Sequence, residues 1–136
     1  MAKNDERFKR GMKLMTSMGR QNNMQNQKAI FPDLYEMSVK HLFGDVWTRP
    51  HLSLRDRELI TIAVNMALGR PTGNIPHFRS ARHIGISKEE ILELIMHVGM
   101  YAGWGTMGFT LDQFRKVLEE ETAPKKENKA VKKRSG

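Results

Sequence analysis

Apolar side chains recur at helical spacing along most of the chain, and the alternating pattern of a β-strand is found nowhere. A first helix is predicted over residues 7–18, with Gly19 as its stop. Its apolar face consists of Phe8, Met12, Met15 and Met18. The polar residues 21–27 are typical of a loop, and a short helix is predicted over residues 33–42, after Pro32.

The strongest helix signals lie in the middle of the chain. Ser53 is followed three residues later by Asp56, which is typical of a helix start. An almost wholly apolar run, residues 59–68, follows and ends at Gly69. Because a helix that is apolar on all sides is usually surrounded by other elements, we expect this one to be buried.

Three further helices complete the pattern. One is predicted over residues 75–84, and a second start signal, Ser87 with Glu90, opens another that ends at Ala102. The last spans residues 106–121, with inward-facing Phe109, Phe114, Val117 and Leu118. Six helices joined by short loops predict one all-α bundle over residues 1–123.

The net charge of +8 is concentrated at the two ends of the chain. Residues 1–20 hold six basic and two acidic side chains, and residues 125–136 hold six basic and one acidic. Residues 21–124 hold 11 basic and 12 acidic side chains, so the predicted bundle is almost neutral. We therefore expect a disordered basic tail over residues 124–136 and no specific nucleic-acid binding.

Composition also narrows the chemistry and the location. The chain has no cysteine, which excludes disulfides, thiolate nucleophiles and sulfur-ligated zinc. It has neither an apolar run of about 20 residues nor a signal-peptide core. We expect a cytoplasmic protein with no membrane partner.

Glu58 is the first candidate for chemistry, because it lies in the most apolar helix of the chain. A carboxylate on an apolar face loses its hydration unless a cation or hydrogen-bond donors hold it. It is either a functional carboxylate or the partner in a buried ion pair with Arg55, Arg57 or Arg79.

His77 is the second candidate, at the start of a helix after the loop of residues 69–73. We expect Asn74 as the N-cap and Pro76 in the first turn. The positive end of the helix dipole favours a neutral imidazole, which can accept or donate a proton. A capping or surface histidine is the alternative. The histidine spacings contain no HxxxH or HExxH, so we predict neither a metal nor a cofactor.

Many spaced positions together resemble the carboxymuconolactone decarboxylase family, whose fold is shared with the AhpD-type alkylhydroperoxidases. The resemblance extends over roughly residues 5–121. It is carried by Trp47, Arg49–Pro50, Leu52, Arg57, Leu59, His77, Ala81, Gly85, Glu90–Ile91 and Tyr101–Gly103, with Arg7, Gly11 and Gly19 in the opening helix.

The departures from the family patterns indicate which activity is lost. The alkylhydroperoxidases have a CxxC where this chain has Arg70 and Gly73, so the resemblance implies no thiol peroxidase. The alkylhydroperoxidases also have a glutamate twelve residues before the first of those cysteines, and Glu58 occupies the corresponding position in this chain. In the decarboxylases a glutamate often stands where Gly73 does, and a proline where Gly105 does.

The resemblance implies a cofactor-independent lyase acting on a small carboxylated lactone or a related acid. His77 would be the proton donor and Glu58 its orienting partner. The implied substrate-binding residues are Arg57, Arg49, Trp47, Tyr101 and Trp104. The assembly implied is a homotrimer or homohexamer. Another proton-transfer enzyme, such as an isomerase or cyclase, and a non-enzymatic ligand-binding oligomer are the alternatives.

Overall fold

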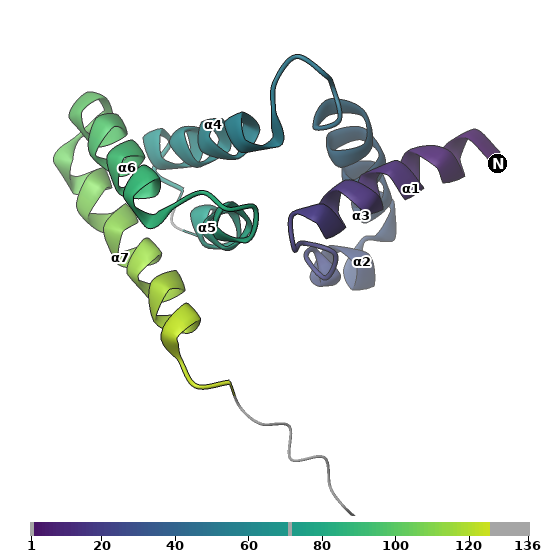
Figure 1. Cartoon of the computed structure of the whole chain (residues 1–136). Coiled ribbons are helices and arrows are strands. Elements are labelled where there is room, and N and C mark those ends of the chain that lie inside the picture. The colour runs from purple at the N-terminus through teal and green to yellow at the C-terminus, as the bar shows by residue number, and fades with distance from the viewer. Residues whose placement is uncertain (1, 71, 126–136) are drawn as a thin grey trace, which may run out of the picture.

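The computed structural model describes residues 2–70 and 72–125, and this part of the chain is all helical, as predicted (Figure 1). It contains seven α-helices and one π-helix, two more than the six predicted. They are α1 (Ala2–Ser17), α2 (Gln25–Ile30), α3 (Pro32–Met37), η1 (Ser38–Val46), α4 (Leu54–Ala67), α5 (Asn74–His83), α6 (Lys88–Ala102) and α7 (Trp104–Thr122). Of the predicted basic tail, residues 126–136 lie outside the described residues.

The two predicted helix starts are confirmed by their caps. The Ser53 hydroxyl accepts a hydrogen bond from the Asp56 amide at 3.0 Å and opens α4. Ser87 and Glu90 form a reciprocal capping box at the start of α6, with bonds of 3.1 and 2.8 Å. Each bond satisfies a backbone donor that a helix end leaves without a partner.

The prediction was wrong in the N-terminal third, where helix replaces loop. Residues 25–27 belong to α2, because glutamine and lysine are good helix formers and the Lys28 amide bonds the Met24 carbonyl at 3.0 Å. The helix expected to end at Leu42 continues through η1 to Val46. A wide turn permits this, since the Trp47 amide bonds back to the Leu42 carbonyl at 2.9 Å.

The helices form two lobes, each with its own apolar core (Figure 1). The N-terminal lobe comprises α1 to η1, and its core contains Met15, Met18, Tyr35, Val39, Phe43 and Trp47. The C-terminal lobe comprises α4 to α7, and its core contains Ile62, Met66, Phe78, Ala81, Ile86, Ile91, Ile95, Phe114 and Val117. Leu54, the first residue of α4, packs against the N-terminal core and so joins the lobes.

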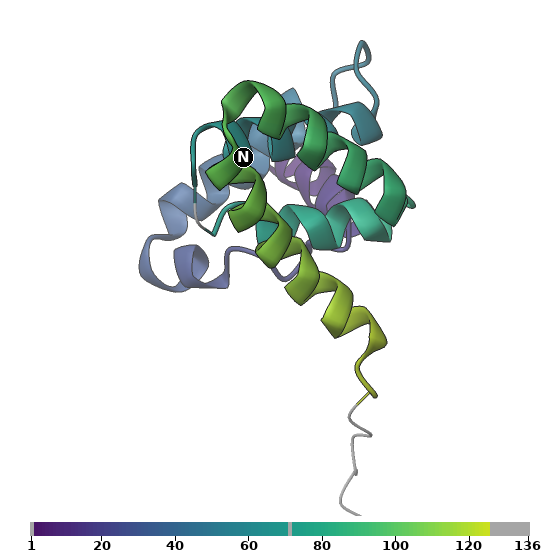
Figure 2. The ribbon, with the colours of Figure 1, turned by 90° about the vertical axis from the view of Figure 1, so that its left-hand side faces the viewer.

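Ion pairs tie the outer helices of the C-terminal lobe together. Arg79 and Arg82 of α5 bind Glu120 and Glu121 near the end of α7, with shortest distances of 2.6 and 2.9 Å. Figure 2 shows this end of α7 extending past the other helices. In the described part of the chain, none of the helices has the length and apolarity that a membrane crossing needs.

The expectation that α4 is buried on all sides was wrong. Its buried face carries Ile62 and Met66, but Ile60, Val64 and Leu68 on the other side are 48%, 48% and 61% exposed. Helices α5, α6 and α7 pack against α4 and leave this side open. Phe109 of α7, expected to face inward, is also exposed.

Helices α1 and η1 approach so closely that only glycine fits between them. A Cβ added to Gly11 would lie 2.0 Å from the carbonyl oxygen of Val39. Contact at that distance with a backbone atom cannot be relieved by turning a side chain, so the helices would have to separate.

We therefore expect Gly11→Ala to lower the free energy of unfolding by about 1–3 kcal/mol, although alanine is the better helix former. Gly108→Ala is the matched control, because Gly108 also lies inside a helix but has no atom within 4 Å of an added Cβ. That change should stabilise by up to about 1 kcal/mol. Urea unfolding of both variants at equal protein concentration measures the two effects, and equal shifts would contradict the close approach.

Asp45 links η1 to α1 by ion pairs with two arginines. Its carboxylate accepts bonds from Arg7 at 2.5 and 3.1 Å and from Arg10 at 2.8 Å. The Arg7 hydrogen bond is the main reason that the pKa of Asp45 is lowered, with Arg10 adding to it.

Since ionised Asp45 favours the folded state, its contribution to stability is present above the ordinary aspartate pKa of about 4. It disappears as the pH falls through the lower pKa of the folded protein. Asp45→Asn should thus lower the melting temperature at pH 7, and the difference from the natural chain should shrink toward pH 3. A difference that stays constant across this range, measured by circular dichroism, would contradict the ion pairing.

Candidate functional site

Glu58 and His77 are in direct contact at the packed faces of α4 and α5. The His77 Nδ1 lies 2.5 Å from the Glu58 Oε1. Glu58 is fully buried, and the His77 side chain is 14% exposed. The resemblance implies Glu58 as the orienting partner of His77, and the two residues are in contact, whereas their catalytic role stays a prediction.

The start of α5 is fixed to α4 differently from the expectation. Gly73 occupies the N-cap position, and Asn74 is the first helical residue. The Asn74 side-chain amide donates instead to the Ile62 carbonyl at 3.3 Å. The predicted N-cap was wrong, because Asn74 satisfies a backbone acceptor of α4 and so holds the first turn of α5, with His77, against that helix.

The contact with Glu58 determines how the imidazole can act. A nitrogen 2.5 Å from a carboxylate oxygen donates its hydrogen to that oxygen, so Nδ1 of His77 carries a proton. In the neutral ring the lone pair is then on Nε2. A carboxylate that fixes one nitrogen leaves the other to exchange protons with a ligand.

Arg20 is a third member of the site, and it comes from the N-terminal lobe. Its Nη1 lies 3.3 Å from Nδ1 and 3.5 Å from Nε2 of His77. Arg20 is only 8% exposed, and its guanidinium lies over the Phe43 ring at 5.5 Å. Burial lowers the pKa of Arg20, while the negative charge of Glu58 acts in the opposite direction.

The turn after α1 brings Arg20 to this place. Gly19 has a φ of 69°, a left-handed conformation that glycine adopts without strain. The Arg20 amide bonds the Met15 carbonyl at 2.8 Å and reverses the chain. Sequence reasoning missed Arg20, because at the end of a basic helix it looks like one more surface charge. Its position directly after the helix-stopping glycine was the available signal.

Two polar atoms of this cluster are buried without a partner. Glu58 Oε2 and Arg20 Nε accept or donate no hydrogen bond within the described residues. Buried polar atoms are nearly always paired, and leaving one unpaired is costly. The cluster of Glu58, His77 and Arg20 therefore retains unused hydrogen-bonding capacity.

The predicted arginine partners of Glu58 were wrong. Arg55 pairs with Glu90, Arg79 pairs with Glu120, and Arg57 donates to the Arg49 carbonyl at 3.1 Å. Each of these arginines binds another acceptor, and the hydrogen-bonding partner of Glu58 is His77.

The structure spreads the other predicted substrate-binding residues over both lobes. Trp47 is buried in the N-terminal core beside Phe43, at 6.0 Å between ring centroids. Arg49 is exposed ahead of α4, while Tyr101 and Trp104 are highly exposed where α6 meets α7. In residues 2–70 and 72–125, no hydrogen bond or ion pair joins these four residues to Glu58 or His77, and their substrate role stays a prediction.

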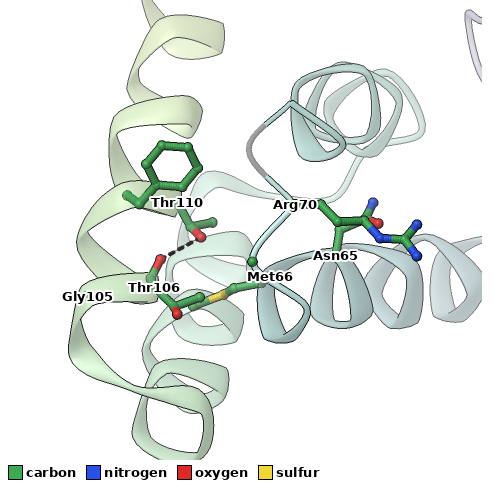
Figure 3. Close-up of a pocket in the computed structure, with 8 residues that line it drawn as sticks. Asn65, Met66, Arg70, Gly105, Thr106 and Thr110 are labelled. Atoms are coloured by element: carbon green, nitrogen blue, oxygen red, sulfur yellow. Dashed lines mark hydrogen bonds between the residues drawn. The ribbon is translucent and has the colours of Figure 1, made fainter.

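A separate cavity of about 340 Å³ lies between the end of α4 and the first turns of α7. It is lined by Asn65, Met66, Gly69, Arg70, Gly105, Thr106, Phe109 and Thr110. In Figure 3, the Met66 side chain extends from α4 toward α7, whereas those of Asn65 and Arg70 point away from the threonines of α7. Thr110 donates to the Thr106 carbonyl at 2.7 Å. Asn65 and Glu58 share the buried face of α4, so the cavity lies two turns from the cluster.

The cluster is suited to proton transfer next to a negative charge on a ligand. His77 can exchange a proton through Nε2, Glu58 can stabilise the imidazolium, and Arg20 supplies a fixed positive charge. Among the residues that the structure describes, no three His, Asp or Glu side chains gather as metal ligands.

Comparisons with known proteins show the family of the chain. Residues 32–115 match the carboxymuconolactone decarboxylase family. A 4-carboxymuconolactone decarboxylase from Acinetobacter baylyi is 33% identical over 132 residues, which cover 93% of this chain and 98% of that protein. The lack of cysteine argues against a thiol peroxidase. The chain belongs to the carboxymuconolactone decarboxylase family.

Proposed function

We propose that the protein is a decarboxylase that releases carbon dioxide from a small carboxylated lactone by proton transfer through His77, without a cofactor. The observation that carries the proposal is the buried contact between His77 Nδ1 and Glu58 Oε1. The decarboxylase name of the Acinetobacter relative supports the reaction class.

The reaction needs both a proton and a place for negative charge. When the bond between the ring carbon and the carboxylate breaks, its electron pair enters the unsaturated lactone and gives a dienolate. Carbon dioxide leaves, and a new carbon–hydrogen bond forms with a proton from His77. Protonation from solvent then restores the imidazolium for the next turnover.

The buried geometry makes His77 an effective acid in this scheme. Glu58 lowers the free energy of the imidazolium that must exist before the proton is delivered. Because Glu58 is excluded from water, its charge acts on the ring more strongly than it would at the surface. The short contact also fixes the plane of the imidazole, so that Nε2 keeps one orientation.

We expect Glu58→Gln and His77→Gln each to reduce the turnover of 4-carboxymuconolactone about 10²-fold to 10⁴-fold, the usual range for general acid–base catalysis. Glutamine keeps a hydrogen-bonding group at each position but cannot exchange the proton. The double variant should lose little more than either single variant, because the residues act as one unit. Carbon dioxide release under saturating lactone measures all three.

Exposed residues of the same two types provide the controls. His83→Gln removes an exposed histidine from α5, and Glu93→Gln removes an exposed carboxylate from α6. Both should keep full activity. If His77→Gln also stays active while Glu58→Gln unfolds the protein, Glu58 is a structural partner and the proposed mechanism fails. Turnover of the lactone without carbon dioxide would favour the isomerase or cyclase alternative.

The proposal extends to an oligomer built on the open side of α4. An apolar groove of about 540 Å³ runs between α4 and α6 and is lined by Ile60, Ala63, Val64, Ala67, His97, Val98, Tyr101 and Ala102. Contiguous exposed apolar surface of this kind usually marks an interface. A trimer or hexamer that covers the groove with a further copy of the chain would remove this surface from water.

We expect light scattering to give a particle several times the 15.7 kDa of one chain. Val64→Glu should dissociate it, because a carboxylate in the groove would lose its hydration on assembly. Lys116→Glu adds the same group at an exposed position of α7 and should leave the particle intact. A natural chain that is monomeric at micromolar concentration would refute the oligomer.

A further inference from the structure

We infer that Arg20 binds a carboxylate of the substrate beside the Glu58–His77 pair, and that it does so from the opposite lobe. The inference deepens the proposed function and rests on it for the nature of the substrate. That Arg20 lacks a counter-ion is independent of the reaction.

Arg20 is a buried cation without a carboxylate partner. It is 8% exposed, and its Nη1 lies within 3.5 Å of both nitrogens of His77. Only Nε2 can accept a hydrogen bond from it, because Nδ1 donates to Glu58. Other arginines reach a carboxylate: Arg7 and Arg10 bind Asp45, Arg55 binds Glu90, Arg79 binds Glu120, and Arg82 binds Glu121. A buried charge normally has a partner, so the missing anion is expected from outside the chain.

Burial removes water from the Arg20 guanidinium. Desolvation is the main reason that its pKa is lowered, and the charge of Glu58 acts in the opposite direction. Glu58 is itself bound to His77 at 2.5 Å. With His77 protonated, as the proposed mechanism requires, Glu58, His77 and Arg20 together carry one net positive charge, which a ligand carboxylate would balance.

The Arg20 guanidinium is held in place and still has unused hydrogen-bond donors. Its contact with the Phe43 ring at 5.5 Å fixes its orientation, and its Nε is buried with no acceptor. The planar fork of an arginine matches the two oxygens of a carboxylate. Since Nη1 lies within 3.5 Å of His77 Nε2, a carboxylate bound here would sit beside the nitrogen that transfers the proton.

The other arginines near the site lack this combination. Arg57 donates to the Arg49 carbonyl, and although its Nε is also buried without a partner, no bond joins it to His77 in the described residues. Arg49 is exposed, so water can stabilise its charge and no anion is required. Arg70 is the main competitor, because it lines the cavity beside α7 and has no carboxylate partner in residues 2–70 and 72–125. It too is exposed.

Arg20 lies where the two lobes meet. Contacts between the lobes include Arg20 with His77, the close approach of Gly19 to the His83 ring, and Leu54 with the N-terminal core. Each lobe has a core of its own. The contact of Arg20 with His77 therefore belongs to neither apolar core.

Calorimetric titration with adipate, an unreactive dicarboxylate, and with its dimethyl ester tests the inference on the full chain. We expect the natural protein to bind adipate at least about 10-fold more tightly than the ester.

Arg20→Met should raise the Kd for adipate about 10-fold to 100-fold and abolish this preference, since a charge-assisted hydrogen bond is lost. Arg20→Lys should give a smaller rise, because it keeps the charge and loses the fork. Arg115→Met, at an exposed position of α7, should change neither value.

Melting temperatures separate binding from a structural role. If Arg20→Met does not fold, a raised Kd in Arg20→Lys at an unchanged melting temperature still supports the inference. Lower melting temperatures with an unchanged Kd in both variants would overturn it. A rise in Kd confined to Arg70→Met would place the anion in the cavity beside α7 and would also overturn it.

The turnover of 4-carboxymuconolactone separates this inference from the proposed function. Adipate binding that depends on Arg20, without carbon dioxide release by the natural protein, would refute the decarboxylase and leave the anion site standing. Carbon dioxide release with an unchanged KM in Arg20→Met would refute the anion site and leave the decarboxylase standing. Absence of adipate binding to the natural protein, combined with an unchanged KM in Arg20→Met, would also refute the anion site.

Discussion

The burial of the Glu58 carboxylate is the constraint on which the arrangement of the C-terminal lobe depends. A carboxylate with no exposed surface, on a helix whose neighbours are apolar, requires a donor at hydrogen-bonding distance. His77 meets this requirement only if α5 begins beside the middle of α4. The amide of Asn74, bound to the Ile62 carbonyl, holds α5 there. The packing of α4 on α5 thus serves the core and the polar pair together.

The same contact makes the N-terminal lobe part of the site. Helix α1 ends at Ser17, and the turn through Gly19 directs Arg20 at the imidazole that Glu58 already holds. The imidazole thus lies in contact with both a carboxylate and a guanidinium. The site therefore spans two bodies with separate cores, joined by a small number of polar and apolar contacts.

Local patterns predicted much of the fold. Capping signals at Ser53 and Ser87 and the glycine stops fix helix ends through interactions within one turn, which the sequence displays directly. The continuation into η1 was missed, because a widened turn leaves the spacing of apolar residues unchanged. The open side of α4 was missed for another reason: an exposed apolar residue has the same appearance in sequence as one in a core.

For the candidate site, the contact of Glu58 with His77 was predictable, because each residue departs from its local surroundings. Arg20 was not, because its burial results from the docking of two lobes that are distant in sequence. The residues that follow it, Gln21 and Asn22, are polar, so nothing local distinguishes a buried guanidinium from a hydrated one. The ion-pair candidates for Glu58 failed similarly, since each arginine had a nearer carboxylate or carbonyl acceptor that only the packed helices reveal.

The placement of Glu58 and His77 within one lobe and of Arg20 in the other assigns the proposed roles of proton transfer and substrate binding to two parts of the gene. Under these proposed roles, substitutions in the turn after α1 would alter which acid is accepted and leave Glu58 and His77 unchanged. New substrates could then be acquired by changing the N-terminal lobe alone, without an evolutionary intermediate that is catalytically inactive. A scaffold with that division is well suited to diversify after gene duplication.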